Sequence, residues 1–409
     1  MMRRVVVTGV GVVSSIGCTA ADFWASLSTG SPGIRPLVGD FHGQQLRMRA
    51  AAQVVDLDIA QQFEPKQAAY LDRFAQLGMV AAREALRDSA LEFTSELAEQ
   101  TAIATGTSLG GKQIEDEGYV QLYAKGAQRL HPFTITRSMH NALTSQLAME
   151  TGVTGPAWTV STACSSANHA IGQAFWMVRS GSAECALVGG AEMPFTLGLL
   201  RAWEAMRVLA PDTCRPFSID RKGLVLGEGA AMLVLEPIER AQARGATIYA
   251  ELAGFGMSAD AHHFTMPSPA GGARAMRAAV RDAGLAPEQI AYVNAHGTGT
   301  AANDAAETRA LREVFGRHAD TLAVSSTKSM HGHTLGAAGA LEAVATVLAL
   351  RHGLLPPTCN SLGPDPACDL DYLTDGPRPL QAEAALSNSF AFGGLNAVLA
   401  FKSPAAVTG

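Results

Sequence analysis

Four side chains that could do chemistry stand in short runs of small residues. Cys164 has small residues on both sides, His296 precedes a glycine, and Lys328 and His333 share one glycine-containing loop. A thiolate can attack an acyl group or bind a metal, and an imidazole can move a proton or donate a hydrogen bond. These residue types predict a reactive site, provided that the fold brings them together.

The pattern around Cys164 predicts how the thiol is presented. Residues 157–161 are apolar and β-prone, and apolar positions three and four apart over 170–178 predict a helix with one buried face. Cys164 lies at the break between them, where the N–H groups at a helix start favour thiolate over thiol. The alternative is a buried structural cysteine, a common place for a free thiol.

Two hypotheses account for one cysteine with two histidines. The first is a zinc site made by Cys164, His296 and His333. Against it, only His331 and His333 form a close ligand pair, and no acidic general base stands at a metalloenzyme spacing. In the second, Cys164 forms a thioester, and the two neutral imidazoles donate N–H bonds to a developing enolate oxygen.

Lys328 and Glu342 fit the second hypothesis. A nearby lysine charge keeps imidazoles neutral, because it disfavours imidazolium. Glu342, nine residues after His333, is placed to hold Lys328. A cysteine protease would use one histidine with an Asn or Asp that orients it, which leaves the second histidine and the lysine without a role.

Strands and helices are expected to alternate along the chain, with the four residues near strand ends. The expected strands are 3–13, 101–107, 157–161, 184–192, 230–236, 249–257, 290–294, 322–325 and a pair over 386–401. The expected helices are 22–27, 72–89, 138–149, 170–178, 239–244, 272–283, 303–315 and 336–350. Residues 115–135 are expected to be a long loop or a broken helix. Two smaller points are a helix N-cap at Asn303 or Asp304, and a buried pair between Arg221 and Glu228.

The second half of the chain repeats the pattern of the first. Each half opens on a strand that carries glycines, Gly9 and Gly11 in one and Gly254 and Gly256 in the other. We therefore expect two similar α/β halves, residues 1–250 with the nucleophile and 251–409 with the two histidines, and a site at the strand ends between them. The first glycines lack the third glycine of a dinucleotide-binding motif, so that function is disfavoured.

Composition excludes several classes of protein. The 409 residues are 47% hydrophobic and only 17% charged, which indicates much interior or interface surface. A net charge of −6 without a basic cluster disfavours nucleic acid as a partner. Six dispersed cysteines indicate reduced thiols in a cytoplasmic protein. The apolar runs are too short for a signal peptide or a membrane span.

Five motifs in order give the chain a family resemblance. They cover residues 162–166, 216–230, 294–300, 328–339 and 388–394. Together they resemble the beta-ketoacyl-(acyl-carrier-protein) synthases of the elongating type, condensing enzymes of the thiolase superfamily. The resemblance implies an α/β, thiolase-like fold of two duplicated halves in a layered α-β-α-β-α arrangement. It also implies a decarboxylative Claisen condensation in fatty-acid, polyketide or polyene elongation, and no cofactor beyond the phosphopantetheine that arrives on the carrier protein.

The same resemblance implies a role for each site residue. Cys164 takes the acyl primer, and the backbone N–H groups of Cys164 and Phe392 form the oxyanion hole. His296 and His333 bind the malonyl thioester and promote loss of carbon dioxide, and Lys328 with Glu342 organises His333. The remaining implied roles are pantetheine binding by Thr298 and Thr300, a gate at Phe392 and Gly393, closure of the acyl pocket by Leu109, and structural support from Asp304.

Departures from the family pattern and alternative functions remain at this stage. Leu395 and Ala391 replace Thr and Gly in the gate loop, and His331 replaces a common Thr, a feature closer to condensing enzymes of specialised pathways such as polyene or nodulation-lipid synthesis. The implied partners are an acyl carrier protein and a second subunit, either a copy of this chain or a related ketosynthase-like protein. One alternative is a non-catalytic chain-length subunit, which typically lacks the nucleophile. The other is a thiolase, which generally carries a second cysteine where Phe392 stands.

Overall fold

A large sheet forms the framework of the protein. The computed structural model describes residues 2–41 and 43–408, and within these ranges ten strands form one sheet in the order β10-β9-β13-β14-β8-β1-β7-β6-β4-β5. The strands are β1 (Val5–Ser14), β4 (Thr101–Gly106), β5 (Ala157–Val160), β6 (Cys185–Glu192), β7 (Gly229–Pro237), β8 (Ala250–Ala259), β9 (Ile290–Asn294), β10 (Ala323–Ser325), β13 (Ala384–Phe390) and β14 (Leu395–Lys402). Two small two-stranded sheets pair β2 (Arg35–Pro36) with β3 (Ala50–Ala51) and β11 (Leu354–Leu355) with β12 (Arg378–Pro379).

The sheet consists of two runs of five strands with the same topology. Counted along the chain, each run has its first strand at the centre of the sheet, followed outward by its fifth, fourth, second and third. The two runs meet where β1 pairs with β8 over Val5–Val7. Cys164 after β5 and His296 after β9 have side-chain atoms within 4.8 Å of each other, so the carboxyl ends of strands from both runs meet at one place.

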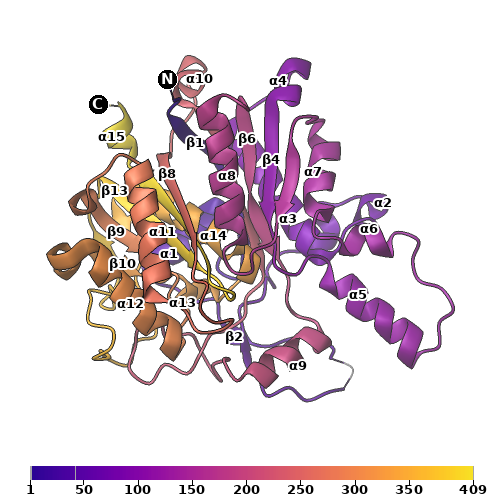
Figure 1. The fold of residues 1–409 in the computed structure, drawn as a ribbon. Coiled ribbons are helices and arrows are strands. Elements are labelled where there is room, and N and C mark those ends of the chain that lie inside the picture. Colours follow the sequence, from indigo (N-terminus) through magenta and orange to yellow (C-terminus); the bar gives the residue numbers. More distant parts are fainter. Residues whose placement is uncertain (1, 42, 409) are drawn as a thin grey trace.

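Helices cover both outer faces and fill the space between the runs. The longer helices are α1 (Ala20–Thr29), α3 (Arg73–Ser89), α5 (Lys112–Tyr119), α7 (Ala142–Thr151), α8 (Ser166–Ser180), α9 (Leu197–Met206), α11 (Pro269–Asp282), α12 (Ala301–Phe315) and α14 (Ala338–His352). The short ones are α2 (Pro65–Ala68), α4 (Ser95–Gln100), α6 (Thr134–Ser138), α10 (Ile238–Ala243), α13 (Lys328–His331) and α15 (Pro404–Thr408). Helices α8 and α14 contact strands of both runs, whereas α3 packs on the first run and α11 on the second (Figure 1). The predicted layered α-β-α-β-α arrangement is confirmed.

Glycines of the two central strands let the outer helices approach closely. A Cβ at Gly11 would lie 2.0 Å from the Ala81 carbonyl oxygen in α3, and a Cβ at Gly256 would lie 2.2 Å from the Ala275 oxygen in α11. Such distances leave no room for a side chain. The repeated glycines therefore serve helix–sheet packing in each half and not a bound nucleotide.

Helix α14 is buried along almost its whole length. The segment Leu335–His352 has the length and composition of a membrane span, but 89% of it is buried inside the protein. A helix that is apolar on all sides is expected where it is surrounded by protein. Its position between the two runs of strands explains its composition.

Several local expectations are wrong. Arg221 and Glu228 do not pair: Arg221 binds Asp365 and lies 3.5 Å from Asp304, while the Glu228 carboxylate accepts from Arg73 at 2.7 Å. The N-cap of α12 is Thr300, whose side chain accepts from the Asn303 N–H, and not Asn303 or Asp304. Residues 328–331, expected as loop, form α13. By contrast, the expectation of a broken helix over 115–135 is confirmed, because this region contains most of α5, a π-helical turn (Val120–Ala124) and the start of α6.

Adding a methyl group at Gly256 should destabilise the protein. Because its Cβ would meet backbone atoms of α11, we expect Gly256→Ala to lower the free energy of unfolding by about 1–3 kcal/mol, the usual cost of overpacking. Urea denaturation followed by circular dichroism measures this. The control is Gly118→Ala in α5, where the nearest atom is a flexible Leu130 methyl at 3.3 Å. Equal stabilities of the two variants would contradict the packing role.

Candidate active site

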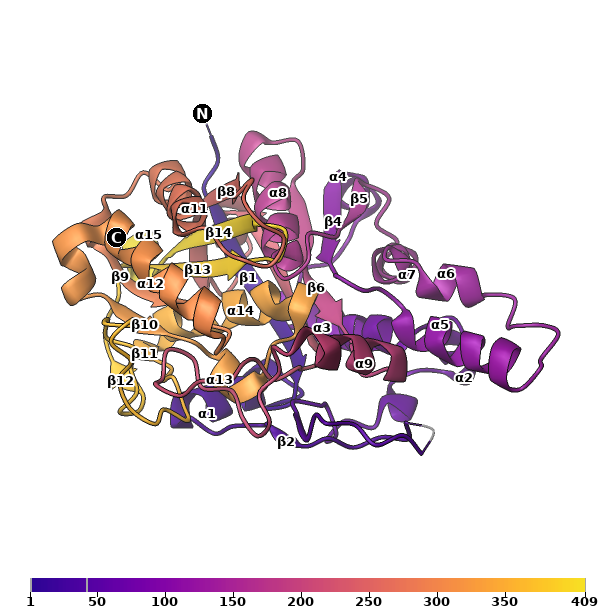
Figure 2. The same cartoon turned by 60° about the horizontal axis from the view of Figure 1, so that its bottom comes forward.

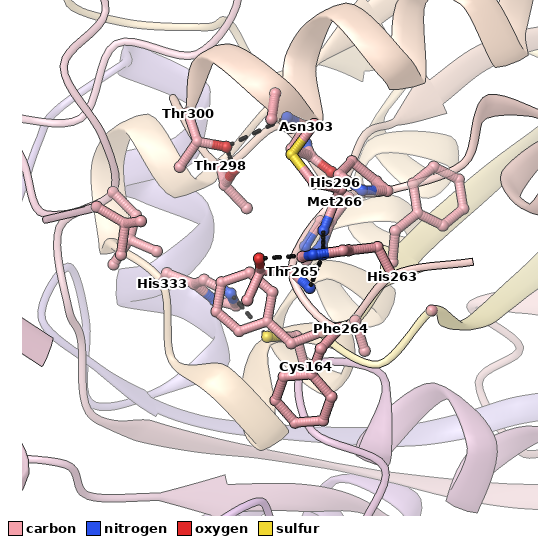
Figure 3. A pocket seen from close by; sticks show the side chains of 18 of the residues that line it. Cys164, His263, Phe264, Thr265, Met266, His296, Thr298, Thr300, Asn303 and His333 are labelled. Atoms are coloured by element: carbon pink, nitrogen blue, oxygen red, sulfur yellow. Dashed lines mark hydrogen bonds between the residues drawn. The ribbon is translucent and has the colours of Figure 1, made fainter. Parts of the chain in front are cut away.

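The fold brings the predicted reactive residues together. Cys164 lies between β5 and α8, His296 follows β9, and Lys328 and His333 follow β10. The sulfur of Cys164 and the facing ring nitrogens of His296 and His333 all lie within 4.8 Å of one another. Figure 3 shows the three side chains converging on one cavity. Cys164 and His333, which are more than 160 positions apart in the sequence, are thus brought into one site by the fold.

A sharp turn presents Cys164 to this group. Ala163 adopts a left-handed conformation with φ of 52°, which costs a residue with a Cβ energy and is typical of constrained sites. The turn is held by the Ser166 hydroxyl, which accepts from the Thr162 N–H at 2.9 Å and donates to the Ala163 carbonyl at 2.6 Å. Helix α8 then starts at Ser166. The predicted strand–turn–helix around the thiol is therefore present.

Hydrogen bonds fix which nitrogen of His333 carries the proton. The Leu335 N–H donates to His333 Nδ1 at 3.2 Å, so Nδ1 is an acceptor. In a neutral imidazole the proton is then on Nε2. Nε2 lies 3.2 Å from the Cys164 Sγ and points its N–H at the sulfur. His333 is thus arranged as a hydrogen-bond donor and not as a base for the thiol.

Lys328 fixes the second imidazole in the same way. Its ammonium group contacts His296 Nδ1 at 3.4 Å and donates to the His296 carbonyl at 2.6 Å. Because an ammonium group only donates, His296 Nδ1 accepts and Nε2 carries the proton. The expectation that Lys328 organises His333 is wrong in its target, since the lysine contacts His296. Its third partner is Glu342, as predicted.

Burial and Lys328 keep both imidazoles neutral. Burial lowers the pKa of His296 and of His333 well below the usual range of histidine, and the Lys328 charge lowers both further. Burial also raises the pKa of Glu342 to about 7, which Lys328 opposes. At neutral pH the site therefore holds two N–H donors and no imidazolium.

Burial opposes ionisation of the Cys164 thiol. Burial raises the pKa of Cys164 to about 11, whereas Lys328 and the backbone N–H of Phe392 lower it. Desolvation of this residue, which is only 6% exposed, thus opposes the thiolate that the helix start is expected to favour. The backbone N–H groups of Phe392 and Cys164 nevertheless face the sulfur.

The donor pattern does not suit zinc. A histidine that binds a metal donates its other ring N–H to an acceptor. Here the other nitrogen of His296 faces the Lys328 ammonium, and that of His333 faces a backbone N–H. Both therefore have the proton on the nitrogen that a metal would need, so we discard the zinc hypothesis.

The cavity above Cys164 contains most of the other predicted site residues. Thr298 and Thr300 line it with their hydroxyls 2.9 Å apart, and Phe392 lines the side nearest the sulfur. Gly393, at φ of 83°, donates its N–H to the Phe264 carbonyl at 2.7 Å. Leu109 does not line this cavity; it packs in an apolar cluster together with residues such as Leu200, Trp203 and Leu335.

Two buried carboxylates hold the loop that carries His296. Asp304 accepts from the Phe217 N–H at 2.8 Å and from the Gly299 N–H at 3.2 Å, which confirms its supporting position. Glu307 was not predicted, yet its two oxygens accept from the N–H groups of His296 and Gly297, each at 2.8 Å. The available signal was a glutamate on the apolar face of the helix over 303–315, beside Ala306 and Leu311.

Other residues of the site also lacked a clear sequence signal. The segment His263–Pro267 lines the cavity mouth, where Phe264 is 77% exposed, and Trp203 stacks on Phe392 with ring centroids 6.3 Å apart. No motif marks these positions. His331 lies outside the cavity; its ring contacts the Gly332 carbonyl and the Thr327 hydroxyl, both at 2.9 Å, so in this chain it braces α13.

The alkylation of Cys164 should be strongly pH-dependent. Because the thiolate is the nucleophile and the pKa is about 11, the rate with iodoacetamide should rise about tenfold per pH unit between 7 and 10. Quantifying the Cys164 peptide by mass spectrometry separates this thiol from the partly exposed Cys18 and Cys359. An alkylation rate that levels off with a midpoint below pH 7 would contradict this prediction, because it would show that Cys164 is a thiolate at neutral pH.

Removal of Lys328 should cost stability, and a second change should restore it. Lys328→Met leaves the Glu342 carboxyl buried without its cation, which should lower the free energy of unfolding by about 3–5 kcal/mol. In Lys328→Met with Glu342→Leu, no charge is left and most of the loss should be recovered. Urea denaturation of both variants measures the difference. If Lys328→Met is as stable as the wild type, the ion pair between Lys328 and Glu342 makes no net contribution to stability.

Comparisons with known proteins show which family the chain belongs to. Residues 2–241 match the model for "Beta-ketoacyl synthase, N-terminal domain" and residues 249–361 that for "Beta-ketoacyl synthase, C-terminal domain". Nodulation protein E of Rhizobium meliloti is 47% identical over 98% of this chain and all of its own, and 3-oxoacyl-(acyl-carrier-protein) synthase 2 of Synechocystis is 42% identical over 98% of both. Among solved structures, "The ishigamide ketosynthase/chain length factor" superposes with a TM-score of 0.92 at 37% identity, covering 98% of this chain and all of that one. The chain belongs to the beta-ketoacyl synthase family.

Proposed function

We propose that this protein condenses an acyl primer, held on Cys164, with a malonyl group on an acyl carrier protein. The products are a 3-oxoacyl carrier protein and carbon dioxide. One observation carries the proposal: two neutral imidazoles with their protons on Nε2 face the sulfur of a turn-presented cysteine. A site of N–H donors without a general base suits the stabilisation of an enolate.

Acyl transfer to Cys164 is the first step. The sulfur attacks the thioester carbonyl of the primer, the C–S bond to the pantetheine arm breaks, and the thiol proton leaves with the pantetheine sulfur. The backbone N–H groups of Cys164 and Phe392 stabilise the oxyanion that forms. Burial opposes the loss of the thiol proton, whereas the Lys328 charge and the Phe392 N–H favour it.

Decarboxylation follows on the malonyl group. The Nε2–H groups of His296 and His333 donate to its thioester carbonyl oxygen, so the electron pair of the breaking C–C bond is held as an enolate while carbon dioxide leaves. The enolate carbon then attacks the acyl-Cys164 carbonyl, and the cysteine sulfur is the leaving group. Lys328 and Glu342 keep His296 in the required tautomer.

The remaining predicted residues serve substrate access. Thr298 and Thr300, on one wall of the cavity, bind the pantetheine arm, and Phe392 with Gly393 acts as the gate to the acyl pocket. Leu109, which belongs to the same apolar cluster as the cavity-lining Trp203, limits that pocket. Exposed Arg207 follows α9 next to the cavity-lining Val208, which places a positive charge for an acidic carrier protein at the entrance.

The protein is proposed to act as a dimer in the cytoplasm. Strand β5 is the last strand of the sheet, and exposed apolar side chains gather on the neighbouring α5–α6 region: Tyr119, Tyr123, Phe133, Ile135 and Met139. Figure 2 shows this region at the end of the molecule away from β10. A second subunit of the same fold, identical or of the chain-length type, would cover it. Likeness to nodulation protein E supports a specialised pathway.

The proposal is tested by supplying acyl and malonyl carrier proteins and following two products. We expect a 3-oxoacyl product and a mass increase of the acyl group at Cys164. Cys164→Gln should abolish condensation while decarboxylation survives, and His333→Ala should lower decarboxylation by about two to three orders of magnitude, as for loss of an oxyanion donor. His331→Thr is the matched control. An unacylated Cys164 in the wild type, with or without a partner subunit, would overturn the mechanism.

A further inference from the structure

Glu192 is a buried carboxylate that the proposed reaction does not use. It is the last residue of β6 and has no exposed surface. Its Oε1 accepts from the Thr107 hydroxyl at 2.9 Å and from the Leu109 N–H at 3.2 Å, and its Oε2 accepts from the Ser108 N–H at 2.7 Å and the Gly336 N–H at 3.0 Å. Both oxygens are therefore fully engaged.

These four bonds join two loops that belong to different halves of the protein. Residues 107–109 end at Leu109, in the apolar cluster beside the acyl pocket, and Gly336 comes directly after Leu335, the donor to His333 Nδ1. The loops are in direct contact, since a Cβ at Gly336 would lie 2.3 Å from the Ser108 nitrogen. A shift of either loop must therefore disturb the Glu192 carboxylate.

Glu192 differs from the other buried glutamates on this sheet. Glu236 on β7 is paired with Arg244, and Glu251 on β8 with Arg4. Among the residues that the structure describes, no cation is paired with Glu192; neutral donors alone satisfy its oxygens. A carboxylate bound in this way costs much desolvation and is a weak choice for simple stability. Burial raises its pKa to about 7, and its charge raises that of Cys164.

We propose that Glu192 is a positioning residue that couples the wall of the acyl pocket at Leu109 to the imidazole of His333. The inference rests on the proposed condensation. An acyl chain on Cys164 that presses on the cluster around Leu109 moves residues 107–109, and Glu192 transmits this to Gly336 and Leu335. The Nε2–H of His333 is then aimed according to the primer in the pocket.

The experiment measures the effect of Glu192 on His333 and its effect on the acyl pocket separately. In a Cys164→Gln background, malonyl decarboxylation reports on His296 and His333 alone. Adding Glu192→Gln places an amide N–H among four donors, so we expect decarboxylation to fall by about ten- to a hundredfold, the size expected for misplacement by about 1 Å. In the wild-type background, Glu192→Gln should also flatten the dependence of kcat/KM on primer length.

A matched control distinguishes this role from general stability. Glu236→Gln removes an equally buried carboxylate from the neighbouring strand and should leave both readouts unchanged in the folded fraction. If Glu192→Gln does not fold, Thr107→Val removes one of the four bonds and should shift both readouts in the same direction by a smaller factor.

The outcomes are distinguishable. Folded Glu192 variants with unchanged decarboxylation and an unchanged primer-length profile would overturn the coupling and leave the proposed function intact. A change in only one readout would also overturn it, because coupling requires both. Failure of the Cys164→Gln protein itself to decarboxylate malonyl carrier protein would instead overturn the proposed function on which this inference rests.

Discussion

The rest of the site depends on one buried cation. Lys328 has no exposed surface, and its three partners are the Glu342 carboxylate, the His296 carbonyl and the His296 ring. An ammonium group in the interior is tolerated only when it is paired and fully hydrogen-bonded. Those requirements also determine the tautomer of His296 and keep both imidazoles uncharged. The stability of the buried Glu342 carboxylate and the chemistry of the imidazoles therefore both require a lysine at position 328.

The layers of the fold bring this interaction about. Glu342 lies on α14, Lys328 begins α13, and His296 follows β9, while Cys164 approaches from α8 on the other side. Because α8 and α14 lie side by side between the two runs of strands, their inner faces can carry small residues and a few polar groups whose partners come from both runs. A single run of five strands could present a cysteine or a pair of histidines, but not both around one cavity.

The alternation of strands and helices along the sequence predicted the fold class. The reactive residues could be predicted because they lie in short motifs of small residues at the ends of strands. The sequence was a poor guide where distance along the chain misleads: Lys328 is five residues from His333 but contacts His296, which comes 32 residues earlier. It also gives no measure of burial, which at Cys164 raises the pKa of the thiol and opposes the effect of the helix start. Glu192 and Glu307 escaped notice because a single carboxylate that accepts backbone N–H bonds leaves no periodic pattern in the sequence.

The order of the elements has a consequence for synthesis on the ribosome. Cys164 and α8 emerge early, yet α14 and the strands β13 and β14, which cover the inner face of α8, lie after residue 337. Domains generally fold from the N-terminus as they are made, and exposed apolar faces favour aggregation. The inner face of α8 therefore stays exposed in the nascent chain until these later elements have been translated. His296 and His333 are made well after Cys164, and Phe392, whose N–H the proposed acyl transfer uses, is made later still, so the site is complete only near the end of translation.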